Sequence, residues 1–302
     1  MRRNQLVAAV LVSTAMFVSA CGLTSRDRVR SLKRMNEGIE LSKKKNMNGA
    51  EKALQEAVAI DKTNAAAHAT LGQIYRQERK FVDAEKAFLA AIENMTEAPN
   101  GKYYYELAVV QSAQGDADGV STQEKTDKYR AAIASFQESL KLNPKLYKAH
   151  YRAARLHEKL DEPEKADGEY RKTIELKPTF SPAFVDLGNM YIDYGFANVA
   201  MRVLEVGTQI NEKDARMWNG LGRAHLSLNQ PQEAVDAFTK AKLIDPDMPD
   251  VLFGLGMAHA EMRSRKEAVE NLELFLQKAD GNTPEDRVKA ARDTVARMQD
   301  VI

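Results

Sequence analysis

The sequence predicts an all-α protein built from a repeated pair of helices, and three spacings in its 302 residues carry that prediction. Alanine recurs in steps of 34 residues, with one step of 48, at Ala50, Ala84, Ala132, Ala166, Ala200, Ala234 and Ala268. Glycine lies twelve residues before five of these alanines, at Gly38, Gly72, Gly188, Gly222 and Gly256. A large side chain follows each alanine by four residues, at Leu54, Phe88, Phe136, Tyr170, Leu204, Phe238 and Leu272.

The first twenty residues have the composition of a signal peptide. Two arginines precede an uncharged and mostly apolar stretch, residues 6–20, which is shorter than the roughly 20 apolar residues of a membrane-spanning helix. The run Val18-Ser19-Ala20-Cys21, which holds the single cysteine, resembles the lipobox of bacterial lipoproteins. That resemblance implies removal of residues 1–20, acylation of Cys21, and a lipidated tether over residues 21–30 that anchors the chain to a lipid bilayer. An Asp directly after the cysteine would resemble an inner-membrane retention signal, but residue 22 is Gly. The resemblance therefore implies the outer membrane and a periplasm-facing chain.

Each repeat carries two apolar patterns with helical spacing. In the stretch 215–248, Leu221 and Ala224 belong to the first pattern, and Ala234 and Phe238 belong to the second. Small residues let the two helices approach closely, and the large residue fills the groove beside them. The prolines fall at repeat edges or turns, including the first turn of a helix, where the missing N–H costs nothing.

This spacing resembles the tetratricopeptide repeat (TPR), and the best copy is Trp218-x-x-Leu221-Gly222 with Ala234 and Phe238. The resemblance implies a right-handed superhelical solenoid of about fifteen helices. A polar-faced helix over 283–302 is expected to cap its last groove. We expect seven helix-turn-helix repeats, over 31–64, 65–98, 101–146, 147–180, 181–214, 215–248 and 249–282.

The repeat 101–146 is twelve residues longer than the others, and the extra residues are 116–127. Ser121 and Glu124 have the spacing of a capping box, which predicts a short loop followed by about two extra turns on the second helix. Asp116 and Asp118 faintly resemble the start of a calcium loop. The later ligands of that loop are missing, so we expect no metal site there.

The composition argues against several classes of function. The formal net charge is +1, with 44 Lys and Arg against 43 Asp and Glu, whereas proteins that bind nucleic acid by bulk charge are strongly basic. A single cysteine excludes an internal disulfide framework and a multi-cysteine metal site. Phosphate-loop, serine-hydrolase and zinc-protease motifs are missing, and the five histidines share repeat positions that Tyr or Trp fill elsewhere. We expect a protein that is not an enzyme and needs no cofactor or metal.

Function is expected on the concave groove of the solenoid. In the TPR proteins that this chain resembles, positions 2, 5, 9, 12 and 13 of each first helix line that groove. Carried over, these positions hold eight basic and four acidic residues, which favours an extended partner with acidic or carboxylate groups. The residues that we expect to bind it are Arg76, Lys102, Tyr105, Lys148, Tyr151, Arg155, Asn189, Asn219, Arg223 and Phe253.

The sequence as a whole is most similar to TPR lipoproteins that act as pilotins or assembly factors for type IV pilus secretins. We therefore expect a membrane-anchored periplasmic scaffold that binds and helps assemble or localise an envelope complex. Lipoproteins of β-barrel assembly and of gliding machinery are alternatives, as is a regulator of a peptidoglycan synthase or hydrolase. The carboxylate clamp of chaperone-binding TPR domains is not expected, because only Lys148 and Arg152 match its five residues.

Overall fold

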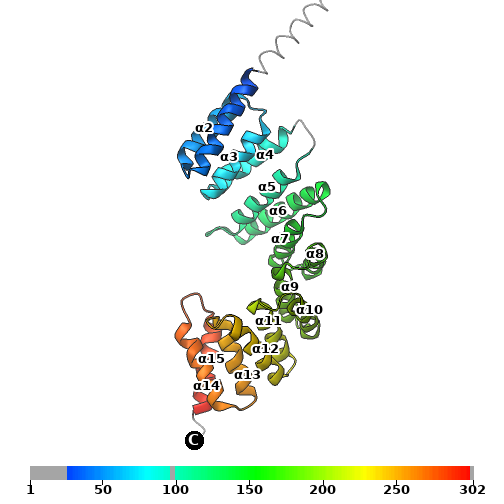
Figure 1. Cartoon of the computed structure of the whole chain (residues 1–302), viewed down its shortest axis with the longest axis vertical. Helices are drawn as coiled ribbons and strands as arrows, with labels where there is room; N and C mark the ends of the chain where they lie inside the picture. The colour runs from blue at the N-terminus through cyan, green and yellow to red at the C-terminus, as the bar shows by residue number, and fades with distance from the viewer. Residues whose placement is uncertain (1–25, 96–98, 300–302) are drawn as a thin grey trace, which may run out of the picture. The chain divides into compact units, whose positions relative to one another are not determined.

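The computed structural model describes residues 26–95 and 99–299, and all regular secondary structure in those residues is helical (Figure 1). Cys21 and the signal-peptide stretch lie outside the described residues. A helix over residues 26–43 is followed by α2 (Met47–Ile60), α3 (Ala65–Gln77), α4 (Phe81–Glu93), α5 (Gly101–Gly115), α6 (Thr122–Leu142), α7 (Tyr147–Lys159), α8 (Pro163–Leu176), α9 (Ser181–Asp193), α10 (Ala197–Ile210), α11 (Ala215–Ser227), α12 (Pro231–Ile244), α13 (Pro249–Glu261), α14 (Arg265–Lys278) and α15 (Glu285–Gln299).

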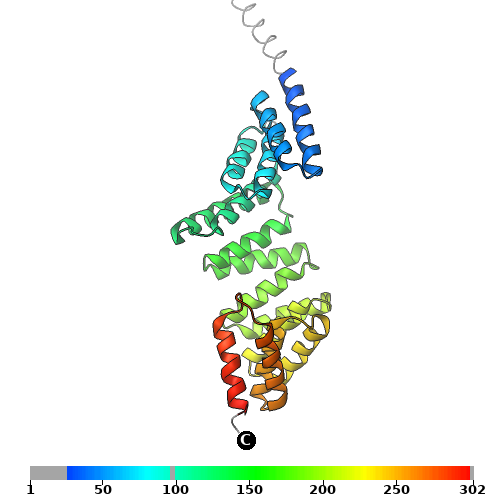
Figure 2. The same cartoon turned by 90° about the vertical axis from the view of Figure 1, so that its left-hand side faces the viewer.

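The helices form two compact units, Met1–Ala149 and His150–Ile302. Within each unit, consecutive helices are joined by short connections and pack side by side, so that each pair rests on the next (Figures 1 and 2). The odd-numbered helices from α3 to α13 are the first helices of their pairs, and the even-numbered helices are the second. This stacking of helix pairs is the TPR solenoid arrangement that the sequence predicts.

The repeated small and large residues form the core. All seven alanines of the 34-residue series, and all seven large side chains that follow them, have 0% of their surface exposed. A Cβ atom on Gly222 would lie 2.7 Å from the ring of Phe238, so only a glycine lets the first helix approach that ring. Each buried side chain of this size contributes about 1.5–3 kcal/mol through the hydrophobic effect.

The turn inside each helix pair uses a left-handed residue, as helix C-termini commonly do. Five of these residues are not glycine, and each stands at the fifteenth position of its repeat: Lys45, Arg79, Asp161, Asn229 and Arg263, with φ between 56° and 61°. Gly195, with φ 80°, is the glycine of the series. The turn therefore keeps one geometry in these six helix pairs while its residue type varies, whereas the longer repeat has its left-handed residue at Gly119, within the loop.

The longer repeat has the predicted form. Residues 116–121 make the loop, and α6 has 21 residues where α4 and α8 have 13 and 14. The side chain of Ser121 accepts a hydrogen bond from the backbone N–H of Glu124 at 3.2 Å, as an N-cap. The first turns of α6 are tied to α4, because Lys128 Nζ lies 2.9 Å from Glu85 Oε2.

The last helix, α15, packs against α14 and α13 and is drawn in red beside them in Figure 2. Ala291 and Thr294 are its buried residues, and Ala291 joins a cluster with Leu272 and Phe275. None of the helices in residues 26–95 and 99–299 is both long and apolar enough to span a bilayer.

Candidate partner-binding surface

The ten residues expected to bind a partner all lie on first helices. In the first unit, Arg76 lies on α3, Lys102 and Tyr105 lie on α5, and Lys148 lies in the first turn of α7. The second unit holds the other six: Tyr151 and Arg155 on α7, Asn189 on α9, Asn219 and Arg223 on α11, and Phe253 on α13.

The best-defined polar arrangement is on α7, α9 and α11, and we call it the first-helix face. It consists of Tyr151, Arg155, Asp186, Asn189, Asp193, Asp214, Arg216, Asn219 and Arg223. Packing between neighbouring first helices brings these side chains together, since Tyr151 contacts the buried cluster that contains Ala183 and Leu187 of α9, and α9 packs against α11.

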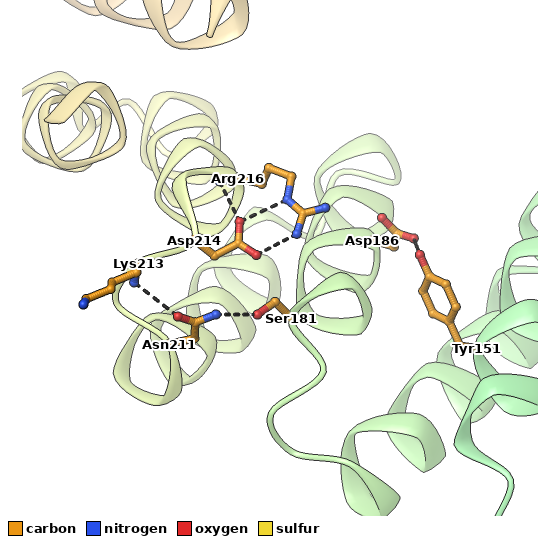
Figure 3. A network of polar contacts seen from close by, with 7 residues as sticks. All are labelled: Tyr151, Ser181, Asp186, Asn211, Lys213, Asp214 and Arg216. Carbon is orange, nitrogen blue, oxygen red and sulfur yellow. Dashed lines mark hydrogen bonds and ion pairs between the residues drawn. The ribbon is translucent and has the colours of Figure 1, made fainter. Parts of the chain in front are cut away.

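Tyr151 and Arg155 of α7 both face Asp186 of α9. The Tyr151 hydroxyl donates a hydrogen bond to Asp186 Oδ2 at 2.6 Å (Figure 3). Arg155 Nε lies 3.9 Å from the same oxygen. The Tyr151 ring meets the Phe180 ring edge-on, with 4.9 Å between centroids. Burial, with the Asp186 carboxylate, raises the pKa of Tyr151 well above its usual value. Tyr151 is therefore a permanent donor that holds Asp186 in place.

Arg216 of α11 is held by the residue that begins its own helix. Asp214 caps α11 by accepting the backbone N–H of Arg216 at 3.0 Å, and its two carboxylate oxygens accept from Nε at 3.0 Å and Nη2 at 2.7 Å (Figure 3). The hydrogen bond to Asp214 is the main reason that the pKa of Arg216 is raised, and the charge of Asp186 adds to it. Burial opposes ionisation of Asp214, but Arg216 outweighs it and lowers the pKa of that carboxyl.

The next turn of α11 continues the pattern. Arg223 Nη1 donates to Asn189 Oδ1 at 2.7 Å and Nη2 donates to Asp193 Oδ1 at 3.1 Å, so Arg223 joins α11 to α9. Asn219 lies between the two arginines of α11 and is 7% exposed. Its buried Oδ1 has no hydrogen-bond partner among the described residues.

The remaining predicted residues are not part of this arrangement. The Phe253 ring packs against Phe275 at 5.2 Å and lies 5.9 Å from the Arg287 guanidinium, so it takes part in the contact with α15. In the first unit, Arg76 Nε lies 3.4 Å from Glu106, and the Tyr105 ring lies 5.6 Å from Phe136. Lys102 and Lys148 are exposed.

The structure adds acidic residues that sequence reasoning missed. Asp186 and Glu106 stand at the sixth position of their repeats, outside the five positions taken to line the groove, and Asp214 stands just before its repeat's first helix begins. The sequence contained a signal for Asp186 and Glu106. A residue at position six lies four residues after position two and three before position nine, so it shares their helix face. Across the first-helix face, Arg155, Arg216 and Arg223 are therefore balanced by Asp186, Asp214 and Asp193, where the five positions alone give a basic excess.

Two depressions on the described part of the molecule lie away from the first-helix face. A depression of about 510 Å³ lies on the second-helix side of the second unit, with Ile174, Val203 and Val206 in its wall, and one of about 660 Å³ lies between α14 and α15. Within residues 26–95 and 99–299, no three His, Cys, Asp or Glu side chains are grouped to hold a metal ion.

Comparison with known proteins bears on the family. Residues 121–179 and 215–248 match tetratricopeptide-repeat family models. Human Superkiller complex protein 3 is 23% identical over 276 residues, which cover 78% of this chain and 17% of that protein. Human Protein O-mannosyl-transferase TMTC3 is 23% identical over 246 residues, covering 80% of this chain and 23% of that protein. The chain thus spans about a fifth of the length of these relatives.

Solved structures share the fold. The C-terminal part of a TPR repeat-containing protein from Cytophaga hutchinsonii has a TM-score of 0.66 at 12% identity, covering 84% of this chain and 98% of that one. Pseudomonas aeruginosa pilF has a TM-score of 0.51 at 20% identity, covering 66% and 88%. YrrB, described as a TPR protein with an unusual peptide-binding site, has a TM-score of 0.51 at 19% identity, covering 69% and 99%. The chain thus carries tetratricopeptide repeats at residues 121–179 and 215–248, and its stacked helix pairs share the tetratricopeptide-repeat solenoid fold of these structures.

Proposed function

We propose that this protein is a membrane-anchored, periplasm-facing scaffold that binds an extended, acidic segment of an envelope protein on its first helices. TPR domains generally mediate protein–protein interaction, typically without catalysis, and they bind peptide partners in the groove of the repeat. The observation that carries the proposal is the first-helix face, where Tyr151 and three arginines stand on neighbouring helices. Tyrosine and arginine contribute a disproportionate share of binding energy at protein interfaces.

The envelope location and the choice of machine rest on the sequence. The run Val18-Ser19-Ala20-Cys21 ahead of a TPR array is the combination found in the type IV pilus secretin pilotins that this chain resembles. We therefore propose the outer membrane as the site of anchoring, and assembly or localisation of a pilus or secretin complex as the task. The fold likeness to pilF is compatible with this proposal.

The binding surface is tested by a double substitution, Tyr151→Ala with Arg155→Glu. The pair removes the ring and the hydroxyl that hold Asp186 and reverses one charge, so partner recovery in an affinity pull-down should fall at least tenfold. Helical circular dichroism should be unchanged, because Arg155 is 55% exposed and Tyr151 is outside the fully buried core.

A charge reversal on the opposite side of the same unit is the matched control. Glu205 is exposed on the second helix α10, and Glu205→Lys should leave recovery at the wild-type level. Equal recovery by the double variant and wild type would show that binding uses another surface. Captured secretin or pilus proteins support the proposed machine, whereas captured cell-wall enzymes favour a peptidoglycan regulator.

The anchor is tested separately with Cys21→Ser. Loss of the acylated thiol should release the protein from the outer-membrane fraction, because stable anchoring needs two or more acyl chains. Folding should be unaffected, since the residue precedes the first described helix. Cell fractionation and immunoblotting provide the measurement, and a variant that sediments with the outer membrane as wild type does, in cells lacking the captured partner, contradicts lipid anchoring.

A further inference from the structure

Asp186 has a role of its own on the first-helix face, and this inference rests on the proposed binding of an acidic segment there. We propose that Asp186 is an internal competitor of the ligand: its carboxylate occupies the space between Arg155 and Arg216 that a carboxylate of the bound segment would take. Asp186 then sets both the affinity for acidic segments and the discrimination against weakly charged ones.

One residue holds Asp186 in place, and a different residue carries the positive charge that Asp186 neutralises. Its firm contact is the 2.6 Å hydrogen bond from the Tyr151 hydroxyl. Arg155 Nε is 3.9 Å away, beyond hydrogen-bond distance, and the Arg155 side chain is 55% exposed. Arg155 is thus attracted by Asp186 without being tied to it, and its guanidinium is accessible to a ligand.

Arg216 on α11 is held differently from Arg155 on α7. Arg216 has one edge of its guanidinium bound by Asp214, whose side chain is only 10% exposed, while the Arg216 side chain is 54% exposed. The charge of Asp186 also contributes to raising the pKa of Arg216, after the hydrogen bond to Asp214. Figure 3 shows Arg216 extending from α11 toward the side of α9 that carries Asp186. The Asp186 carboxylate thus lowers the positive potential at two exposed guanidinium groups, in addition to the effect of Asp214 on Arg216.

The consequence for binding follows from Coulomb attraction and repulsion. An acidic segment lying across α7, α9 and α11 would be attracted by Arg155 and Arg216 and repelled by Asp186 at a similar distance. Asparagine in place of Asp186 removes the negative charge, while its side-chain oxygen can still accept the Tyr151 hydroxyl. Asp186→Asn should therefore strengthen binding of an acidic segment by about fivefold, which corresponds to about 1 kcal/mol.

The test uses the purified full-length protein in detergent and two synthetic peptides, acetyl-(Ala-Glu)6-amide and acetyl-(Ala-Gln)6-amide, each labelled for fluorescence anisotropy. Asp186→Asn should bind the glutamate peptide about fivefold more tightly than wild type does, and the gain should shrink in high salt. Its affinity for the glutamine peptide should equal that of wild type. Asp236→Asn, the same chemical change at an exposed position of the second helix α12, should change neither affinity.

Two further variants separate this inference from the proposed function. Tyr151→Phe deletes the hydroxyl but keeps the Asp186 charge, so it should give no gain; an equal gain would assign the effect to loosened packing and overturn the inference. Arg155→Ala should abolish binding of the glutamate peptide. If it does so while Asp186→Asn binds no better than wild type, the binding surface stands and the competitor role falls. If neither wild type nor Asp186→Asn binds the glutamate peptide, both fall.

Discussion

At the residue scale, His157, His225 and His259 share one repeat position, and the first two are matched with the residue five positions later. His157 Nδ1 is 2.7 Å from Glu162 Oε2, and His225 Nδ1 is 2.8 Å from Gln230 Oε1. In each case the partner is the N-cap residue of the following helix, so the ring joins the end of the first helix to the start of the second. The turn of the repeat thus explains why His157 and His225 stand at this position.

His259 is the exception in this series. Its Nδ1 is buried without a hydrogen-bond partner among the described residues, and burial lowers the pKa of the ring. The matching position five residues on is Ser264, the N-cap of α14, whose side chain makes no capping hydrogen bond. Repeat 249–282 therefore has the histidine ring of His259 but lacks the side-chain hydrogen-bond partner that Glu162 and Gln230 provide in the other two repeats.

Ser264→Gln should supply that acceptor in the way that Gln230 does for His225. Satisfying a buried polar group contributes about 1 kcal/mol, so the free energy of unfolding of the second unit should rise by roughly that amount. Urea unfolding followed by circular dichroism measures it, with Ser264→Ala as the control that adds no acceptor. A Gln variant no more stable than the Ala variant would mean that the ring is satisfied in some other way.

At the element scale, the extended helix α6 is secured by a partly buried polar network. Glu85 of α4 accepts hydrogen bonds from Gln111, Gln114 and Lys128, at 3.1, 2.8 and 2.9 Å. Burial opposes ionisation of Glu85, but these bonds and the Lys128 charge outweigh it and lower the pKa of the carboxyl. The extra turns of the longer repeat are therefore part of the packed first unit.

Lys128→Ala should destabilise the first unit, because it leaves the Glu85 carboxylate partly buried without its cation. The side chains of Glu85 and Lys128 are 19% and 29% exposed, so screening by solvent limits the cost to about 1–2 kcal/mol. Because the pKa of Glu85 is lowered on folding, its contribution is fully present above the ordinary carboxyl pKa and is lost as the pH falls from there through the lowered pKa.

Urea unfolding at pH 7 and at pH 3 measures both parts of this prediction, and the difference between Lys128→Ala and wild type should be smaller at pH 3. Lys141→Ala is the control, since its pair with Glu138 is a solvent-exposed one, which is worth little. Equal effects of the two substitutions would contradict a special role for the network.

At the scale of the whole molecule, a solenoid is held together by contacts between neighbours, and its ends fray first. In the second unit the end is covered by α15, which packs with Leu252, Leu272 and Phe275 through Ala291. Those three side chains are at most 1% exposed while α15 is in place. The capping helix thus protects the last repeat from water.

Truncation after Asn282 should expose this cluster. Each uncovered large side chain loses up to about 1.5–3 kcal/mol of burial, so amide-exchange protection of α13 and α14 should fall sharply, while α9 and α10 keep theirs. Hydrogen-exchange mass spectrometry resolves the two regions in one experiment. Unchanged protection of α13 and α14 would show that α15 is dispensable.

The sequence by itself determined the architecture of this protein. A period of 34 residues with small and large residues at fixed offsets specifies which face of each helix is buried, because helical periodicity converts spacing into direction. All fourteen of those alanines and large residues are completely buried, and the Ser121 cap and long α6 follow equally local rules. Such features depend on residues near one another in the chain, so they can be read without knowing how helices pack.

The charge pattern of the candidate site was decided by the tertiary structure. Asp186 and Arg155 are 31 positions apart, and their encounter depends on how α7 and α9 pack, which the repeat period does not specify. Phe253 shows the same limit, since contact with α15 rather than its repeat position decides what its ring touches. Packing between helices decides which polar side chains meet, because charge balance depends on distances between side chains on separate helices.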